Sequence, residues 1–556
     1  MTADSSPLID LVRDSLIGEN EAVLGPYGVR RVTYADYTAS GRSLSFIEDY
    51  IREAVLPLYA NTHTEASGTG LQTTRFREEA RDIIRRAVGA DDSYAVVFCG
   101  SGSTGAINRL LDVLSLRLPA NLDDRYRLRD AIPPDERPLV FIGPYEHHSN
   151  ELPWRESIAD VVVVGEDGDG RIDLDGLERD LVEHRRRPLI IGSFSAASNV
   201  TGVISDVQAT TELLHRYGAL AFWDYAAAAP YVQIDVRPGA AGQLDAVFIS
   251  PHKFIGGPGT PGLLVARKDL FANPVPSVPG GGTVEYVNPS EHRYISDVEH
   301  REEGGTPAII ESIRAGLVFQ LKEQVGVDLI RRREESFIER AIARWRQNEN
   351  LEILGNPDLE RLSIVSFVVR HCGRYVHHNF VVALLNDLFG IQARGGCSCA
   401  GPYGHRLLGI DLDRSHAFAR EIAGGCEGIK PGWVRLSFNY FISEATFEFI
   451  LDAVDLVASE GWKLLPEYCF DARSGLWRHG SFRAEPAMSL HDLCLAGGSV
   501  AFQAHRHSEP ETELPRYLAE ARQRLSSPGS GPTQRQDLSA EFEQLRWFWL
   551  PSEIVS

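Results

Sequence analysis

One lysine stands in a glycine-rich loop between two short apolar runs. The segment QLDAVFISPHKFIGGPGTPGLLVAR, residues 243–267, predicts a strand, a tight loop and a second strand. Lys253 lies in that loop, and the glycines after it let the backbone approach a ligand closely. At a strand end among apolar residues an ammonium is poorly solvated, which favours a neutral amine able to condense with an aldehyde. On this motif alone, an ordinary loop lysine remains the commoner interpretation.

A carboxylate at the end of the preceding apolar run makes the lysine more informative. The run ALAFWDY, residues 219–225, places Asp224 at a predicted strand end a few tens of residues before Lys253. In pyridoxal phosphate enzymes, such a carboxylate pairs with the protonated pyridine nitrogen and the lysine carries the aldehyde carbon. Together, FWDYA and SPHKFIGGPG resemble the fold type I enzymes that depend on pyridoxal 5'-phosphate, specifically the class V aminotransferase and cysteine desulfurase family. The resemblance covers roughly residues 30 to 460.

Length and composition set the frame for this interpretation. A chain of 556 residues is too long for a single hydrophobic core, so more than one domain is expected. Its 43% hydrophobic and 24% charged residues are ordinary for a globular enzyme. The net charge of -21 argues against nucleic acid or an anionic membrane as the main partner. No run approaches the ~20 apolar residues that span a bilayer, so a cytoplasmic location is the default expectation. Seven cysteines, an odd number, argue against a disulfide framework.

The order of the patterns predicts the architecture. Between residues 95 and 270, strand-like and helix-like stretches alternate, which predicts crossover units in a mostly parallel sheet with helices on both faces. Ligands bind such sheets beyond the carboxyl ends of the strands. We therefore expect an α/β fold of the fold type I transferases with a smaller α+β C-terminal domain. The expected divisions are an N-terminal arm (1–30), a large cofactor-binding domain (31–310), a small domain with its connecting helix (311–464) and a C-terminal extension (465–556).

A sequence pattern typical of anion binding follows the predicted strand AVVFCG. The stretch GSGSTGAINRLLDVL places glycine and hydroxyl residues directly before a helix, where unpaired N–H groups and the helix dipole favour an anion. We interpret Ser103 and Thr104 as binding the cofactor phosphate. Ordinary helix capping explains the same residues when they are taken alone.

The resemblance assigns further residues to the cofactor. His147, in the loop EHHSN followed by PW, would stack on the pyridine ring and shuttle protons; a surface histidine pair is the alternative. Asn199, in SNVTG, would bond the phenolic oxygen and the substrate carboxylate. Thr306, in the turn GGTP, would reach the phosphate across a two-fold homodimer interface. The remaining cofactor residues it implies are Ser250 and His252, which flank Pro251 before Lys253.

Two positions of the expected large domain depart from the family pattern. Ala227 stands where the family usually has a glutamine three residues after the aspartate, so one hydrogen bond to the phenolic oxygen is missing or replaced. His63 matches a family histidine that approaches the partner subunit's site, but Thr64 replaces the arginine that often follows it.

The small domain carries the second part of the expected chemistry. In QARGGCSCAGPYGH the resemblance implies that Cys399 accepts sulfur as a persulfide, and a thiolate near arginine is the attacking form. Relatives often have two histidines before this cysteine, where the chain has Cys397 and Ser398. The C-x-C pair is also compatible with a redox couple, a metal site or an incidental spacing, although four-ligand zinc spacing is absent. A purely structural Cys399 also stays open.

The predicted function follows from these residues. Arg435, in GWVRLSF, would hold the substrate carboxylate together with Asn199, with an ordinary surface arginine as the alternative. The resemblance implies a homodimeric cysteine desulfurase that converts L-cysteine to alanine, with a possible sulfur-acceptor protein and no metal. Two rivals remain: a C–S lyase, epimerase or aminotransferase of the same family without a persulfide step, and a cofactor-free sulfur-relay scaffold.

Overall fold

The computed structural model describes residues 6–62, 64–237, 239, 242–483, 488–505, 507–529 and 538–554. His63, one of the expected site residues, lies outside these ranges. The chain divides into two compact units. Unit 1 comprises Met1–Ile17, Tyr37–Arg333 and Asp358–Leu362, and unit 2 comprises Gly18–Asp36, Glu334–Pro357 and Ser363–Ser556. Among the described residues, no helix is both long enough and apolar enough to cross a lipid bilayer.

Unit 1 is built on a seven-stranded sheet. Its strands are β4 (Tyr94–Cys99), β5 (Leu139–Ile142), β6 (Asp160–Val163), β7 (Ile190–Ser195), β8 (Leu220–Asp224), β9 (Ala246–Ile249) and β10 (Gly262–Arg267). They lie in the order β4-β10-β9-β8-β7-β5-β6, and only β10 runs antiparallel to its neighbours. Every residue of β4, β5, β7 and β9 is buried, as expected for strands covered on both faces. The expected mostly parallel sheet is confirmed.

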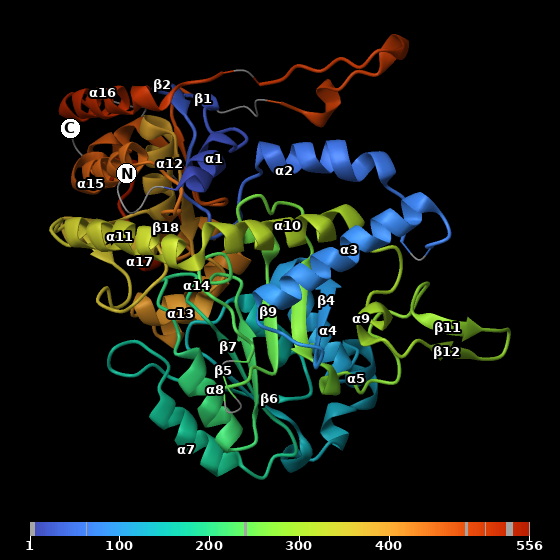
Figure 1. Ribbon diagram of the computed structural model, residues 1–556. Helices are drawn as coiled ribbons and strands as arrows, with labels where there is room; N and C mark the ends of the chain where they lie inside the picture. Colours follow the sequence, from blue (N-terminus) through green and yellow to red (C-terminus); the bar gives the residue numbers. More distant parts are fainter. Residues whose placement is uncertain are drawn as a thin grey trace. The chain divides into compact units, whose positions relative to one another are not determined.

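Helices and one hairpin complete unit 1. The helices are α1 (Pro7–Asp14), α2 (Ser45–Tyr50), α3 (Gly68–Ala87), α4 (Gly102–Val113), α5 (Ala120–Tyr126), α6 (Leu152–Arg155), α7 (Leu174–His184), α8 (Val207–Arg216), α9 (Val298–Arg301) and α10 (Ile309–Val325). Strands β11 (Val284–Val287) and β12 (His292–Tyr294) pair as the hairpin, which projects from the rest of unit 1 in Figure 1. Helices α3 and α10 lie side by side (Figure 1).

The connecting helix expected at the start of the segment 311–464 is interrupted. Helix α10 ends at Val325 and α11 (Val327–Trp345) begins two residues later. The residue between them, Gly326, has a positive φ of 87° and its N–H donates to the carbonyl of Lys322. A glycine in this conformation is a common way to end a helix, because other residues pay a steric cost there.

Unit 2 is an α+β domain around an antiparallel sheet. The sheet order is β13-β14-β18-β17, with β15 also paired to β14. The strands of unit 2 are β1 (Ala22–Gly25), β2 (Gly28–Arg31), β3 (Thr33–Tyr34), β13 (Leu351–Ile353), β14 (Ile364–His371), β15 (Arg374–Val376), β16 (Ile391–Gln392), β17 (Arg394–Gly396), β18 (Trp433–Ser437), β19 (Tyr468–Asp471) and β20 (Leu476–His479). Its other helices are α12 (His378–Phe389), α13 (Gly401–Leu407), α14 (Leu412–Ala423), α15 (Glu444–Glu460), α16 (Leu514–Ser526) and α17 (Ala540–Leu545).

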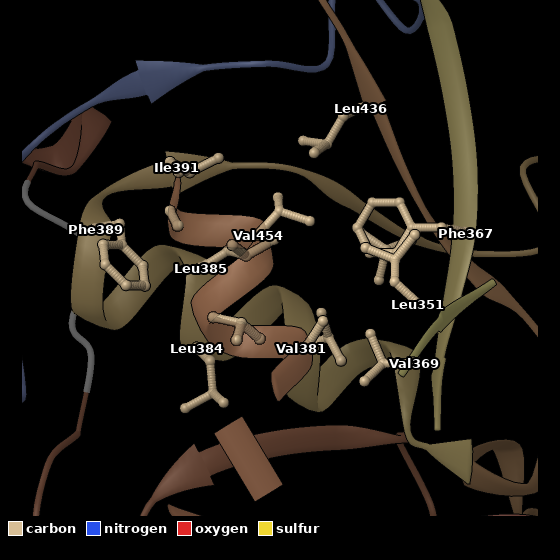
Figure 2. Packing of buried hydrophobic residues seen from close by; sticks show 14 of the residues in the cluster. Leu351, Phe367, Val369, Val381, Leu384, Leu385, Phe389, Ile391, Leu436 and Val454 are labelled. Carbon is tan, nitrogen blue, oxygen red and sulfur yellow. The ribbon is translucent and has the colours of Figure 1, made fainter. Parts of the chain in front are cut away.

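The core of unit 2 forms between its sheet and its long helices. Figure 2 shows Leu384 and Leu385 of α12 and Val454 of α15 in the same cluster as Phe367 of β14 and Leu436 of β18. All five side chains are fully or almost fully buried, so the hydrophobic effect fixes the sheet that carries β17 and β18. The expected smaller α+β domain is confirmed.

Two segments join unit 2 that the sequence-based division placed elsewhere. Strand β3 near the N-terminus pairs in parallel with β16, and this attaches residues 18–36 to unit 2. The described part of the C-terminal extension also belongs to unit 2, where Tyr517 and Phe548 are buried in the core. The aromatic C-terminal end therefore packs on unit 2 through Phe548.

The contact between α3 and α10 gives a stability prediction. A Cβ added at Gly316 of α10 would lie 2.6 Å from the Cβ of Ala80 of α3. We expect Gly316→Val to lower the free energy of unfolding by about 1–3 kcal/mol, because the helices must separate. Gly68→Ala is the control, since no atom lies within 4 Å of its added Cβ, and should change stability by less than about 0.5 kcal/mol. Urea unfolding measures both; equal stability of the two variants would contradict the close packing.

Candidate active site

The turn that carries Lys253 follows β9, and a segment near the N-terminus contacts its backbone. Residues Pro251–Lys253 form a short 3-10 helix in which the Lys253 N–H donates to the carbonyl of Ser250 at 3.1 Å. The Gly41 N–H donates to the carbonyl of His252 at 2.9 Å, and a Cβ on Gly41 would lie 2.0 Å from the carbonyl oxygen of Phe254. The absence of a side chain at Gly41 therefore permits a close backbone contact that helps to hold Lys253 in place.

Histidine 252 is neutral in this turn. Burial, together with the positive charge of Lys253, lowers the pKa of His252 to about 4. An uncharged ring beside the lysine avoids a second positive charge at the same place. The uncharged His252 ring is thus suited to pack against a bound ligand, while Lys253 keeps the positive charge.

Asp224 ends β8 as the sequence predicted, and it is only 3% exposed. Its Oδ1 accepts a hydrogen bond from the Ala226 N–H at 2.8 Å. Burial raises the pKa of Asp224, while the Ala226 N–H, the charge of Lys253 and the Ser103 hydroxyl oppose that rise. The structure therefore brings together Asp224, Lys253 and Ser103, which are far apart in the sequence.

The start of α4 closes this group. The Ser103 N–H donates to Ser250 Oγ at 2.8 Å, so the helix start is tied to the lysine turn. Gly102 has a positive φ of 54°, and an added Cβ would lie 2.8 Å from Ser250 Oγ. The N-cap residue, Ser101, makes no side-chain hydrogen bond to the first turn of α4. The helix thus begins without the usual side-chain cap, which leaves N–H groups for an anion.

A hydrogen-bonded chain links α4 to the histidine loop after β5. Thr104 Oγ1 and Ser149 Oγ are 2.6 Å apart, and Ser149 Oγ lies 3.0 Å from His147 Nδ1. The Ser149 N–H also donates to His147 Nδ1 at 3.1 Å, so that nitrogen acts as an acceptor. Thr104 and His147 were expected from the sequence, whereas Ser149, which connects them, was not.

Glu146 is a buried carboxyl that the sequence analysis also missed. It accepts hydrogen bonds from the Ser195 N–H at 2.8 Å, the Ser195 hydroxyl at 2.6 Å and the Asn150 side chain at 2.7 Å. Burial raises its pKa to about 7, and the negative charge of Asp224 contributes to the rise. Its place four residues after the apolar strand β5 was the available signal, but the sequence interpretation used only the histidine pair beside it.

Lys322 on α10 supports the segment that follows Asp224. Its Nζ donates to the carbonyls of Ala229 at 2.7 Å and Val232 at 2.5 Å. The same ammonium lies 5.8 Å from the ring centroid of Phe254, the residue after Lys253. Burial lowers the pKa of Lys322 to about 7. A buried lysine in a helix carried no recognisable sequence signal of this role.

The other two expected residues of unit 1 occupy different surroundings. Asn199 lies in the buried turn after β7 and is 8% exposed. Thr306 is exposed before α10, and its Oγ1 accepts a hydrogen bond from Asn61 Nδ2 at 3.4 Å. Its expected role across a dimer interface stays a prediction.

In unit 2, Cys399 lies in a tight turn with an unusual backbone. The Ala400 N–H donates to the carbonyl of Cys397 at 3.0 Å, which closes a four-residue turn. The two central residues, Ser398 and Cys399, have positive φ values of 51° and 56°. Two positive φ angles define a type I′ turn, which favours asparagine and glycine. Residues with a Cβ carry strain there, and such strain concentrates at functional sites.

Arg435 is held by a carboxylate from the N-terminal segment of unit 2. Its Nη2 donates to Asp36 Oδ1 at 2.8 Å, and the side chain is 3% exposed. In the register of β17 and β18, Arg394 lies directly opposite Arg435. Burial lowers the pKa of Arg435, Asp36 opposes that effect, and Arg394 adds to it. The expected carboxylate-binding guanidinium is therefore already paired within unit 2.

Comparison with known proteins places this geometry in a family. The profile of the family described as aminotransferase class-V matches residues 33–445. The chain belongs to the aminotransferase class-V family. The resemblance seen in the sequence is thereby confirmed, and the family is one of pyridoxal-phosphate enzymes. Strands β4 to β10, α4 and the sheet of unit 2 all lie within the matched residues.

Individual relatives have low sequence identity to this chain but align with it over most of their length. A probable cysteine desulfurase of Streptomyces coelicolor is 28% identical over 381 residues, 67% of this chain and 84% of that protein. One from Halobacterium salinarum is 26% identical over 397 residues, 70% of this chain and 88% of that protein. The apo cysteine desulfurase of Thermococcus onnurineus has a similar fold, with a TM-score of 0.65 at 24% identity, covering 83% of this chain and all of that one.

The residues of unit 1 fit the cofactor of class-V enzymes. A Cβ at Gly102 would crowd Ser250 Oγ, and the start of α4 has no side-chain cap, so the backbone N–H groups there suit a phosphate. The buried carboxyl of Asp224 and the amine of Lys253 stand at neighbouring strand ends. Pyridoxal phosphate presents one group for each of these three features.

The raised pKa of Glu146 predicts a pH dependence of stability. Its pKa rises from 4.5 in the unfolded chain to about 7 in the fold, so between these values the folded state keeps a proton that the unfolded state releases. The free energy of unfolding therefore falls as pH rises through this window, by up to about 3 kcal/mol from this group.

Glu146→Gln isolates this effect, since glutamine does not titrate. The stability of the wild-type protein relative to the variant, measured by urea unfolding from pH 4 to pH 8, should decrease as pH rises and level off above about 7. Parallel stability curves for the two proteins would show that Glu146 titrates at an ordinary value.

Proposed function

We propose that this protein is a pyridoxal-phosphate-dependent enzyme that takes sulfur from L-cysteine and releases L-alanine. The observation that carries the proposal is the convergence of Lys253, Asp224 and the start of α4 at one edge of the unit 1 sheet. The Cys399 turn and the desulfurase names of the class-V relatives support cysteine as the substrate.

The residues of unit 1 have distinct tasks in this proposal. Bound pyridoxal phosphate would supply an aldehyde and an electron sink. Lys253 would hold that aldehyde in the resting enzyme and, once released by the substrate amine, move the proton of the substrate α-carbon. Asp224 would hold a proton on the ring nitrogen. Ser103 and Thr104 would orient the phosphate, and His147, fixed through Ser149, would pack on the ring.

Cys399 would take the sulfur. Its thiolate attacks the sulfur of the bound cysteine, the carbon–sulfur bond breaks, and the substrate carbon takes a proton and leaves as alanine. Cys399 keeps the sulfur as a persulfide. Arg435 and Asn199 would hold the substrate carboxylate, which requires Arg435 to share its guanidinium between Asp36 and the substrate.

The same proposal includes a two-fold dimer. Thr306 is exposed and would then reach the phosphate site of the second subunit. A second candidate function is a C–S lyase, epimerase or aminotransferase without a persulfide step. Ala227 favours it, because this buried methyl group cannot provide the hydrogen bond that a glutamine gives in the family pattern.

Removal of the thiol separates the two candidates. Cys399→Ala should lower alanine and sulfide formation from L-cysteine in the presence of a reductant by at least about 100-fold, because the nucleophile is lost. The visible absorbance of the bound cofactor should persist, since the cofactor residues lie in unit 1. Cys372→Ala, which removes an exposed thiol elsewhere in unit 2, is the control and should keep full turnover. Unchanged turnover in Cys399→Ala would favour the second candidate.

A further inference from the structure

We propose that a pocket within unit 2 binds a small thiol that bears carboxylate groups, and that this thiol takes the sulfur from Cys399. The inference rests on the proposed function for its transfer step, but the binding site itself does not. The pocket has a volume of about 490 Å³, within the range of small-molecule sites, and all of its lining residues belong to unit 2.

Both thiols of the strained turn line this pocket. Cys397 is exposed and Cys399 is half-buried, and they occupy the first and third positions of the turn. The positive φ angles at Ser398 and Cys399 are costly for residues with a Cβ, and the turn persists because the flanking strand β17 fixes its entry. A molecule in the pocket therefore meets reactive sulfur at its wall.

Two buried polar groups on the pocket wall have no hydrogen-bond partner among the described residues. They are His378 Nδ1, from the first turn of α12, and Trp433 Nε1, from the start of β18. His378 is 6% exposed and Trp433 is 1% exposed. Leaving buried polar atoms unpaired costs about 1–3 kcal/mol each, so the pocket wall carries hydrogen-bonding capacity that the described residues leave unused.

The rings that carry these two groups pack closely against glycines. A Cβ at Gly404 would lie 2.6 Å from the Trp433 ring, and one at Gly432 would lie 2.9 Å from His378 Cε1. Burial lowers the pKa of His378 to about 3, so its ring is neutral and can either donate or accept. The two polar groups are thus fixed in position before a ligand arrives, which reduces the entropic cost of binding.

Arg394 supplies the charge preference. It lines the pocket, and its guanidinium has no carboxylate partner among the residues that the structure describes. Lys430, the other cation of the pocket, is paired with Glu427 at 2.6 Å. A free guanidinium binds carboxylates in a bidentate manner. Leu408, Ile410 and Phe418 add apolar surface to the lining, which suits the carbon skeleton of the ligand.

The transfer step balances without any added oxidant or reductant. The thiolate of the bound molecule attacks the outer sulfur of the Cys399 persulfide and forms a new sulfur–sulfur bond. The bond between that sulfur and Cys399 Sγ breaks, and its electron pair leaves on Cys399 as thiolate. The ligand departs as a persulfide, and Cys399 is ready for the next cysteine.

Binding is tested on the holoenzyme with S-methylglutathione, which has two carboxylates and cannot accept sulfur. We expect saturable binding by calorimetry. Ala419→Trp should weaken it at least about 10-fold, because Ala419 is exposed on the pocket side of α14 and the indole fills the space. Ala423→Trp, one turn later on α14 and not part of the pocket lining, is the matched control and should bind as the wild type does.

Transfer is tested with reduced glutathione as the acceptor. Ala419→Trp should raise the KM for glutathione at least about 10-fold, and Ala423→Trp should not. Absence of saturable binding to the wild type, or equal binding by both variants, would overturn the pocket assignment. Sulfur delivery only to a protein thiol, unaffected by S-methylglutathione, would overturn the small-molecule acceptor. Binding with no alanine formed from L-cysteine would instead overturn the transfer step and the proposed function together.

Discussion

The hydrogen bond between the Ser103 N–H and Ser250 Oγ is the contact on which the candidate site depends. It joins the first turn of α4 to the turn that carries Lys253, at the ends of strands that are not consecutive in the sequence. Two glycines make this approach possible. A Cβ at Gly102 would crowd Ser250, and one at Gly262 would lie 1.9 Å from the carbonyl oxygen of Gly102. An anion at the start of α4 and an amine at Lys253 are therefore kept at a fixed separation.

Burial then determines the charges around this contact. Asp224 and Glu146 are both buried, and burial raises the pKa of each carboxyl. The surroundings of the two carboxyls differ. Asp224 has the nearby ammonium of Lys253, which favours its charged form. Glu146 has only neutral donors and the negative charge of Asp224, so it keeps its proton more readily. Two carboxyls in one site can thus hold different protonation states near neutral pH.

The sequence predicted the residues whose position follows from a strand end. Asp224, Lys253 and Ser103 converge because the carboxyl ends of parallel strands meet at one edge of a sheet. It did not predict the pairing of Arg435 with Asp36, because contacts across almost the whole chain leave no local pattern. Nor did it show that β3 would pair with β16 and carry residues 18–36 into unit 2. The break at Gly326 was readable, since a lone glycine in a long amphipathic pattern is a candidate helix end.

If one amine holds the cofactor against Asp224 and the start of α4, chemical reduction can identify that amine. Reduction of the purified protein with borohydride fixes a pyridoxyl group on the lysine that carries the aldehyde, and peptide mass spectrometry then locates it. We expect the modification at Lys253 alone. A pyridoxyl group on another lysine, such as Lys322, or on none in protein supplied with pyridoxal phosphate, would contradict it.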